Sequence, residues 1–84
     1  MSDQTLPLLI AEWARNSRDR IRVRLNTYHG RATIELREWY PEDGEWKAGR
    51  AGITLGVEHL RTLADAVAKA LEAAHSRNLI PPAG

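Results

Sequence analysis

The stretch at residues 20–40, RIRVRLNTYHGRATIELREWY, decides the fold of this 84-residue chain. In its first nine residues Ile21, Val23 and Leu25 alternate with three arginines and an asparagine. A period of two is typical of a β-strand, which here has one apolar face and one cationic face. Gly30 then supplies the positive φ that a tight hairpin needs, and ATIELREWY continues the alternation. The stretch therefore predicts a β-hairpin with an apolar side and an arginine-rich side.

Two further extended segments flank this hairpin. Residues 8–14, LLIAEWA, fit a short strand or a helical turn, and the turn composition of the following NSRD favours the strand. The PEDG sequence at residues 41–44 predicts a reverse turn. A fourth extended segment, EWKAGRAGITL at residues 45–55, follows it, with a break expected near Ala48 and Gly49. We therefore expect four strands in chain order.

The C-terminal part of the chain predicts one helix. Apolar residues recur there every three or four positions and form a single stripe: Leu60, Leu63, Ala64, Val67, Leu71 and Ala74. Gly56 is expected to be the N-cap, inside a hydrophobic staple between Leu55 and Leu60, and Asn78 the C′ residue. We expect the helix to pack on the apolar face of its own sheet, or also to meet a second copy, and to leave the arginine-rich face open. The fold class is therefore α+β, with the element order ββββα.

Length and composition limit the functions that fit this chain. We expect one domain over residues 1–84, with a core at about residues 7–77 and flexible tails at residues 1–6 and 79–84. Because there is no cysteine, disulfides and cysteine-based zinc sites are excluded, and the three histidines form no short metal-ligand pattern. We find no nucleophile elbow or phosphate-binding loop, and predict neither enzyme activity, nor a metal, nor a cofactor. No signal peptide or membrane-spanning segment is recognised, so we expect a cytoplasmic protein without a membrane partner.

The charges are unevenly distributed along the chain. Its net charge is only +1, yet six arginines lie between residues 15 and 31, against the single acid Asp19. Basic side chains with aromatic rings among them suit a single-stranded nucleic acid, because cations follow the phosphates and bases stack on the rings, at about 1–3 kcal/mol per base. Two alternatives stay open. The rings could belong to the core beside solvated arginines, or the cationic face could dock an acidic protein as part of a dimeric interaction module.

A longer stretch, residues 28–55, resembles the C-terminal domain of the eukaryotic transcriptional coactivator positive cofactor four, and resembles the bacterial relatives of that domain more closely. The pieces that carry the resemblance are YHGR at 28–31, IELRE at 34–38, WY at 39–40, EDG at 42–44 and KAGRAGITL at 47–55. The resemblance covers about residues 10–74. It implies a curved four-stranded antiparallel sheet followed by one helix, in a dimer whose two sheets form a continuous surface, which is a Whirly-like fold of single-stranded-DNA-binding transcriptional regulators.

The resemblance also implies a function and a set of partners. Members of the family bind single-stranded DNA and melted duplex with little sequence preference, and some influence transcription. For this chain we therefore expect a homodimer that binds single-stranded DNA in transcription regulation or DNA maintenance. RNA and the transcription machinery are further expected partners.

Positions that match the family pattern imply individual contacts. Tyr28 would be a stacking ring, and His29, in place of the usual lysine, would approach a phosphate. Neighbours on a strand face opposite sides, so only one of Trp39 and Tyr40 can stack: the alternation favours Trp39, the resemblance favours Tyr40, and both are kept. The complete expected interface is Arg20, Arg22, Arg24, Tyr28, His29, Arg31, Arg37, Trp39, Tyr40, Lys47 and Arg50.

Overall fold

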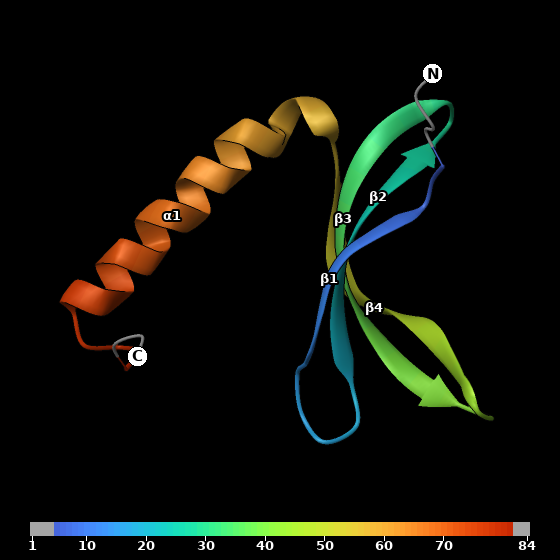
Figure 1. Ribbon diagram of the computed structural model, residues 1–84, viewed down its shortest axis with the longest axis horizontal. Coiled ribbons are helices and arrows are strands. Elements are labelled where there is room, and N and C mark those ends of the chain that lie inside the picture. The colour runs from blue at the N-terminus through green and yellow to red at the C-terminus, as the bar shows by residue number, and fades with distance from the viewer. Residues whose placement is uncertain (1–4, 82–84) are drawn as a thin grey trace.

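The computed structural model describes residues 5–81 and has a four-stranded antiparallel sheet followed by one helix (Figure 1). The strands β1 (Leu8–Ala14), β2 (Arg20–Tyr28), β3 (Arg31–Glu42) and β4 (Glu45–Gly56) pair in chain order, so β1 and β4 form the edges. A short 3₁₀ helix, η1 (Val57–His59), leads into α1 (Leu60–Ser76). The predicted α+β class and element order are confirmed, including the strand at residues 8–14.

The pairing register decides which side chains share a face of the sheet. Val23 lies opposite Leu36, and Leu36 lies opposite Ile53 on the next strand. Paired residues of antiparallel strands project from the same face, so these apolar side chains form one continuous surface. We call it the apolar face, and it comprises Leu8, Ala11, Trp13, Ile21, Val23, Leu25, Ile34, Leu36, Ile53 and Leu55.

The β2–β3 and β3–β4 hairpins both close with two-residue turns that have positive φ at both positions. The first is formed by His29 (φ 53°) and Gly30 (φ 78°), and the second by Asp43 (φ 54°) and Gly44 (φ 77°). Turns of this kind match the twist of the flanking strands. The first turn confirms the prediction for Gly30. The predicted turn over residues 41–44 is wrong at its start, because Pro41 lies within β3 and pairs with β4. The pairing of β3 with β2 ends before Pro41, and a position with a neighbour on one side only tolerates proline.

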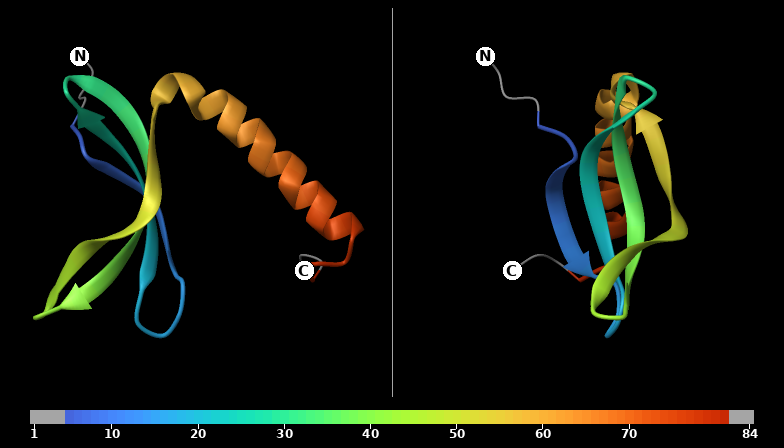
Figure 2. Two further views of the ribbon diagram at one scale, coloured as in Figure 1. Left: turned by 180° about the vertical axis from the view of Figure 1, so that it is seen from behind. Right: turned by 90° about the vertical axis from the view of Figure 1, so that its right-hand side faces the viewer.

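The break expected near Ala48 and Gly49 is a β-bulge within a continuous strand. Arg37 pairs with Gly52 whereas Trp39 pairs with Ala48, so three residues of β4 stand opposite the one residue between them. Gly52 is needed there, because a Cβ atom would lie 2.7 Å from the carbonyl oxygen of Leu36. A bulge bends its strand, and Figure 2 shows β4 bending partway along its length.

The helix α1 stands away from the sheet. Figures 1 and 2 show it leaving the end of β4 and running outward, and no residue of α1 is buried. The prediction that it packs on the apolar face of its own chain is therefore wrong. Its start differs too, because Gly56 caps η1 and His59 is the N-cap of α1. The extended backbone of Gly56 and the 3₁₀ turn after it direct the helix away from the strands.

The C-terminal end of α1 has the predicted geometry. Asn78 has a φ of 57° and donates its backbone N–H to the carbonyl oxygen of His75 at 3.1 Å. The N–H of Leu79 donates to the carbonyl oxygen of Ala74 at 2.9 Å. This pair of bonds is a Schellman motif, so Asn78 is the C′ residue as expected. Most residues of the tails predicted at residues 1–6 and 79–84 lie outside the described residues. The domain boundaries stay a prediction.

A single chain has very little core. Ile34, 4% exposed, is the one apolar side chain counted as buried among residues 5–81. The accessible surface is 6733 Å², whereas a folded monomer of this mass exposes about 5,000 Å². The radius of gyration is 15.2 Å, against about 12 Å for a compact domain of this length. The apolar face and the stripe of α1 are therefore left largely uncovered by the chain itself.

Candidate nucleic-acid interface

The sheet carries its arginines on the side opposite the apolar face. The alternation in β2 puts Arg20, Arg22 and Arg24 there, and the register adds Arg37 and Trp39 of β3. We call this side the arginine face, and it comprises Glu12, Arg20, Arg22, Arg24, Tyr28, Arg31, Thr33, Glu35, Arg37, Trp39, Trp46 and Thr54. Seven of the eleven expected interface residues lie on it: Arg20, Arg22, Arg24, Tyr28, Arg31, Arg37 and Trp39.

Arginines and tryptophans are in contact across the arginine face. The Cζ atoms of Arg22 and Arg24 lie 4.7 Å and 4.9 Å from the ring centre of Trp39. Those of Arg20 and Arg22 lie 5.5 Å and 5.8 Å from the ring centre of Trp46. All four distances are within the roughly 6 Å over which a cation is attracted to an aromatic ring. The guanidinium groups therefore lie against the rings, and a base that stacked on Trp39 would have to share that ring with arginine.

Two carboxylates partly neutralise this face. Glu12 Oε2 lies 3.1 Å from Arg22 Nε and 3.9 Å from Arg20 Nε. Glu35 Oε1 lies 2.7 Å from Arg24 Nη2, and Glu35 Oε2 lies 3.5 Å from Arg37 Nε. Each carboxylate therefore bridges two arginines. Because four arginines meet two carboxylates, this group keeps an excess of two positive charges.

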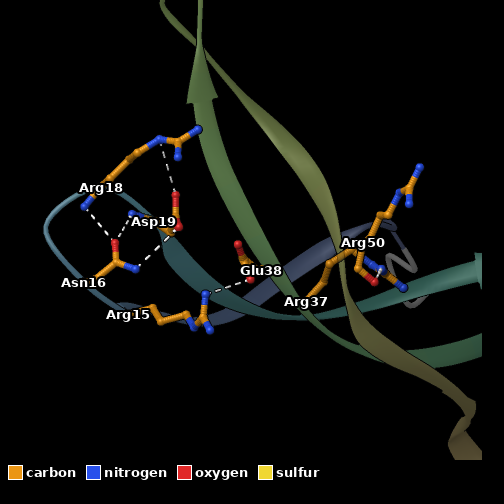
Figure 3. Close-up of polar contacts among 7 residues, drawn as sticks. All are labelled: Arg15, Asn16, Arg18, Asp19, Arg37, Glu38 and Arg50. Atoms are coloured by element: carbon orange, nitrogen blue, oxygen red, sulfur yellow. Dashed lines mark hydrogen bonds and ion pairs between the residues drawn. The ribbon is translucent and has the colours of Figure 1, made fainter.

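Arg37 also holds the β-bulge of β4. Its Nη1 donates to the carbonyl oxygens of Gly49 at 3.1 Å and Arg50 at 3.3 Å, and its Nη2 donates to Thr54 Oγ1 at 3.4 Å. Figure 3 shows the Arg37 side chain lying against the backbone of Arg50. Arg37 therefore joins β3 to β4, and its expected phosphate contact stays a prediction.

The tip of the β2–β3 hairpin carries the exposed ring of Tyr28 and the side chains of His29 and Arg31. Tyr28 is 66% exposed, and the ring of His29 meets it edge-on at 4.2 Å between centroids. Arg31 pairs with Tyr28 across the turn and has no acidic partner among the described residues. The side chain of Arg50, which lies in the bulge, likewise has none within residues 5–81. These cations are available to an anionic ligand without breaking an ion pair.

Tyr40 and Lys47 are not brought together with the arginines. They pair with each other, one residue along from the pair of Trp39 and Ala48, so they project from the opposite side of the sheet. The Cζ atom of Arg18 lies 5.9 Å from the Tyr40 ring centre, and Lys47 Nζ lies 4.0 Å from Glu45 Oε1. The sequence kept both Trp39 and Tyr40 as candidates for stacking. In the structure, Trp39 is the one that lies on the arginine face.

Sequence reasoning missed Trp46 as a member of this face. The two-residue turn at Asp43 and Gly44 pairs Pro41 with Trp46, which places this ring on the same side as Trp39. The DG sequence could have revealed it, because DG is a strong signal for a two-residue hairpin turn. The predicted turn over residues 41–44 starts earlier than the observed one, and the sequence pattern assigns Trp46 to neither face.

Other kinds of site find little support in the described part of the chain. Within residues 5–81 no three histidine, aspartate or glutamate side chains come together as a metal site would require. Over the same residues no helix is both long and apolar enough to cross a bilayer. The arginine face is therefore the candidate site that the structure offers.

Comparison with known proteins finds one matching family and a similar curated protein. The sequence pattern of the family Transcriptional Coactivator p15 (PC4) matches residues 15–66. The RNA polymerase II transcriptional coactivator KIWI of Arabidopsis thaliana is 33% identical over 73 residues, which cover 83% of this chain and 64% of KIWI, so the chain spans less than two thirds of that relative.

Solved structures agree with the sequence comparison. A PC4 homologue from Burkholderia pseudomallei has a TM-score of 0.68 at 26% identity, and the match covers 82% of this chain and 95% of that one. The structure of a MoSub1–ssDNA complex has a TM-score of 0.63 at 27% identity, over 79% of this chain and 77% of that one.

Proposed function

Since the chain belongs to the family of Transcriptional Coactivator p15 (PC4), we propose that it binds single-stranded DNA along the arginine face, with little sequence preference. The observation that supports this most strongly is the interleaving of four arginines with Trp39 and Trp46 on a sheet face that α1 leaves uncovered. A relative of the same fold has been solved with single-stranded DNA. A role in transcription regulation or DNA maintenance follows the same family, and the transcription machinery is a proposed partner.

Unpaired strands suit this face better than a duplex does. Bases of a single strand can stack on exposed rings, whereas a duplex keeps its bases stacked on one another. The arginines meet phosphates, which every sequence carries, so they add affinity without sequence selection. The absence of enzyme activity and the cytoplasmic location predicted from the sequence remain predictions.

We also propose that two copies associate through the surfaces that a single chain leaves uncovered. The chain exposes about 1,700 Å² more than a compact monomer of its mass would. A standard protein interface covers about 800 Å² on each partner, so a dimer interface of standard size over the apolar face and the α1 stripe would remove about half of this excess. Val67 and Leu71 of that stripe are 55% and 51% exposed in one chain.

A fluorescence titration with oligo-dT at two salt concentrations tests the proposed function. We expect quenching of tryptophan emission, saturable binding, and a log–log salt slope of about −0.7 for each phosphate neutralised. An RNA oligonucleotide of equal length measures the preference between the two nucleic acids. No saturable binding at low salt would contradict the proposal and would favour the acidic-protein alternative.

Replacing Glu35 by glutamine should strengthen DNA binding and weaken folding at the same time. The change frees Arg24 and Arg37 from a carboxylate that competes with phosphate. Each phosphate contact releases about 0.7 counterions, so its contribution to affinity grows about fivefold for each tenfold fall in salt concentration. Relative to 1 M salt, a new phosphate contact should therefore raise the affinity about fivefold at 0.1 M salt. The unfolding free energy should fall by about 1–3 kcal/mol, because a largely buried charge loses its partner.

The matched control is Glu72→Gln, which makes the same change on the exposed helix α1. It removes the same charge from the whole protein, so it should leave affinity and stability nearly unchanged. If both variants bind DNA equally, the ion pairs of Glu35 do not compete with phosphate.

A further inference from the structure

A groove opens at the end of the arginine face, where the β1–β2 hairpin and the β3–β4 hairpin separate. The pairing of β2 with β3 ends at Arg20 and Trp39, and Figure 1 shows the β1–β2 loop and the β3–β4 hairpin diverging beyond that point. The groove has a volume of about 570 Å³, which lies within the roughly 300–1,000 Å³ of small-ligand pockets. Its walls are Ala14, Asn16, Ser17, Arg18, Asp19, Arg20, Pro41 and Trp46.

One wall of the groove is a rigid loop. Asn16 Oδ1 accepts hydrogen bonds from the backbone N–H groups of Arg18 at 2.8 Å and Asp19 at 2.7 Å, as Figure 3 shows. The carbonyl oxygen of Asp19 accepts from the N–H of Arg15 at 2.9 Å, and Asp19 itself is buried. The loop therefore keeps its shape without a ligand, so the groove is already formed in the free protein.

The opposite wall offers a flat ring beside cations. Trp46 is 38% exposed, whereas Trp39 is less exposed and more closely covered by arginine. The guanidinium groups nearest to Trp46 lie farther away than those on Trp39, so part of its ring is open. Arg18 is 64% exposed at its side chain and Arg20 is 43% exposed. Of these two, Arg20 is the one whose guanidinium lies at Trp46, with Cζ 5.5 Å from the ring centre. A flat apolar surface next to this cation fits a nucleotide, whose base would stack while its phosphate met the arginine.

We propose that this groove is a nucleotide subsite in which an unpaired base stacks on Trp46 and the adjoining phosphate meets Arg20. The inference rests on the proposed function and extends the bound strand beyond Trp39 to the end of the sheet. It names a binding residue and a wall, the β1–β2 loop, that the expected set of eleven residues does not contain. Trp46 contributes stacking, so its effect should be independent of salt.

The test combines two variants with two ligands. Binding of wild type, Trp46→Ala and Trp46→Phe is measured with oligo-dT and with an abasic phosphodiester strand of the same length. Trp46→Ala should weaken oligo-dT binding about 5- to 100-fold, which corresponds to about 1–3 kcal/mol for one stacked base. It should leave the salt slope and the affinity for the abasic strand unchanged. Trp46→Phe, which keeps a ring, should restore most of the loss.

The outcomes distinguish a failure of the Trp46 subsite from a failure of the proposed DNA-binding function. If wild type binds neither ligand at low salt, the proposed function fails and the subsite with it. If wild type binds oligo-dT and Trp46→Ala binds it equally well, the function stands and the subsite is wrong. If Trp46→Ala weakens both ligands alike, the ring supports the structure and stacks no base. Trp13→Phe, which changes a tryptophan on the apolar face, shows the effect of losing a tryptophan elsewhere.

Discussion

Replacing Val67 by aspartate should convert the proposed dimer into monomers. Val67 lies in the middle of the apolar stripe of α1 and is uncovered in a single chain. In a dimer that buries this stripe, the aspartate would be an unpaired charge away from water, at a cost of about 3–5 kcal/mol. The dissociation constant of the dimer should therefore rise by at least about 100-fold. Sedimentation or light scattering at micromolar concentration measures the change.

The same substitution should weaken binding to long strands more than to short ones. An oligonucleotide long enough to contact both copies binds the second one intramolecularly, which raises its affinity about 100-fold or more. A short oligonucleotide that occupies one arginine face gains nothing from the second copy. Thr62→Asp, which changes the net charge by the same one unit, is the matched control, because Thr62 is exposed and lies on the far side of α1 from Val67. A wild-type protein that is monomeric at micromolar concentration, or a Val67→Asp protein that stays dimeric, would contradict the proposed association.

Replacing Arg22 and Arg24 together by glutamine should weaken single-stranded DNA binding about 25-fold at 0.1 M salt. Each phosphate contact is worth about fivefold under these conditions, and two contacts are lost. The log–log salt slope should become shallower by about 1.4. The loss should be similar for all base compositions, because phosphates carry no sequence information. Fluorescence anisotropy with labelled oligonucleotides over a salt series measures both quantities.

The control for this pair is Arg61→Gln with Arg77→Gln, which lowers the net charge equally near the two ends of α1. If the control loses as much affinity as the test variant, binding follows the charge of the whole protein. The glutamines can still donate to Glu12 and Glu35, and circular dichroism should show that the sheet is retained. If the test variant is folded and its affinity for single-stranded DNA is unchanged, the arginine face is not the DNA-binding surface.

The alternation in residues 20–40 was enough to predict the two central strands of the sheet. Because the period of two fixes the side of every residue on a strand, it correctly separated Ile21, Val23 and Leu25 from the arginines. It also put Trp39 on the side of Arg37, where the structure has it. The family resemblance, which favoured Tyr40, carried no information about the register of these two neighbours. Whether either ring meets a base stays a prediction.

The position of the helix could not be predicted from the sequence. The stripe from Leu60 to Ala74 shows that one side of α1 is apolar, but it does not say which surface covers that side. In this chain the extended Gly56 and the turn at Val57–His59 direct α1 outward, so the stripe finds no cover on its own sheet. A pattern within one chain cannot separate packing on that chain from packing on another copy.

The neutralisation of the arginine face was also beyond the sequence pattern. Glu35 was expected on this side, but its bridge between Arg24 and Arg37 depends on the pairing of three strands and on side-chain conformation. Glu12 reaches Arg22 only because the bulge in β1 sets the register of that strand. Cations counted along a sequence therefore overstate the charge available to DNA.

The indole N–H signals of the three tryptophans give the most direct test of which side of the sheet meets DNA. Trp39 and Trp46 lie on the arginine face, and Trp13 lies on the apolar face. Single tryptophan-to-phenylalanine variants assign the three NMR signals, and a short oligo-dT is then titrated into the wild-type protein. We predict that the signals of Trp39 and Trp46 shift with saturation while that of Trp13 stays in place. A shift of Trp13 alone, or no shift during saturable binding, would contradict the arginine face as the DNA-binding surface.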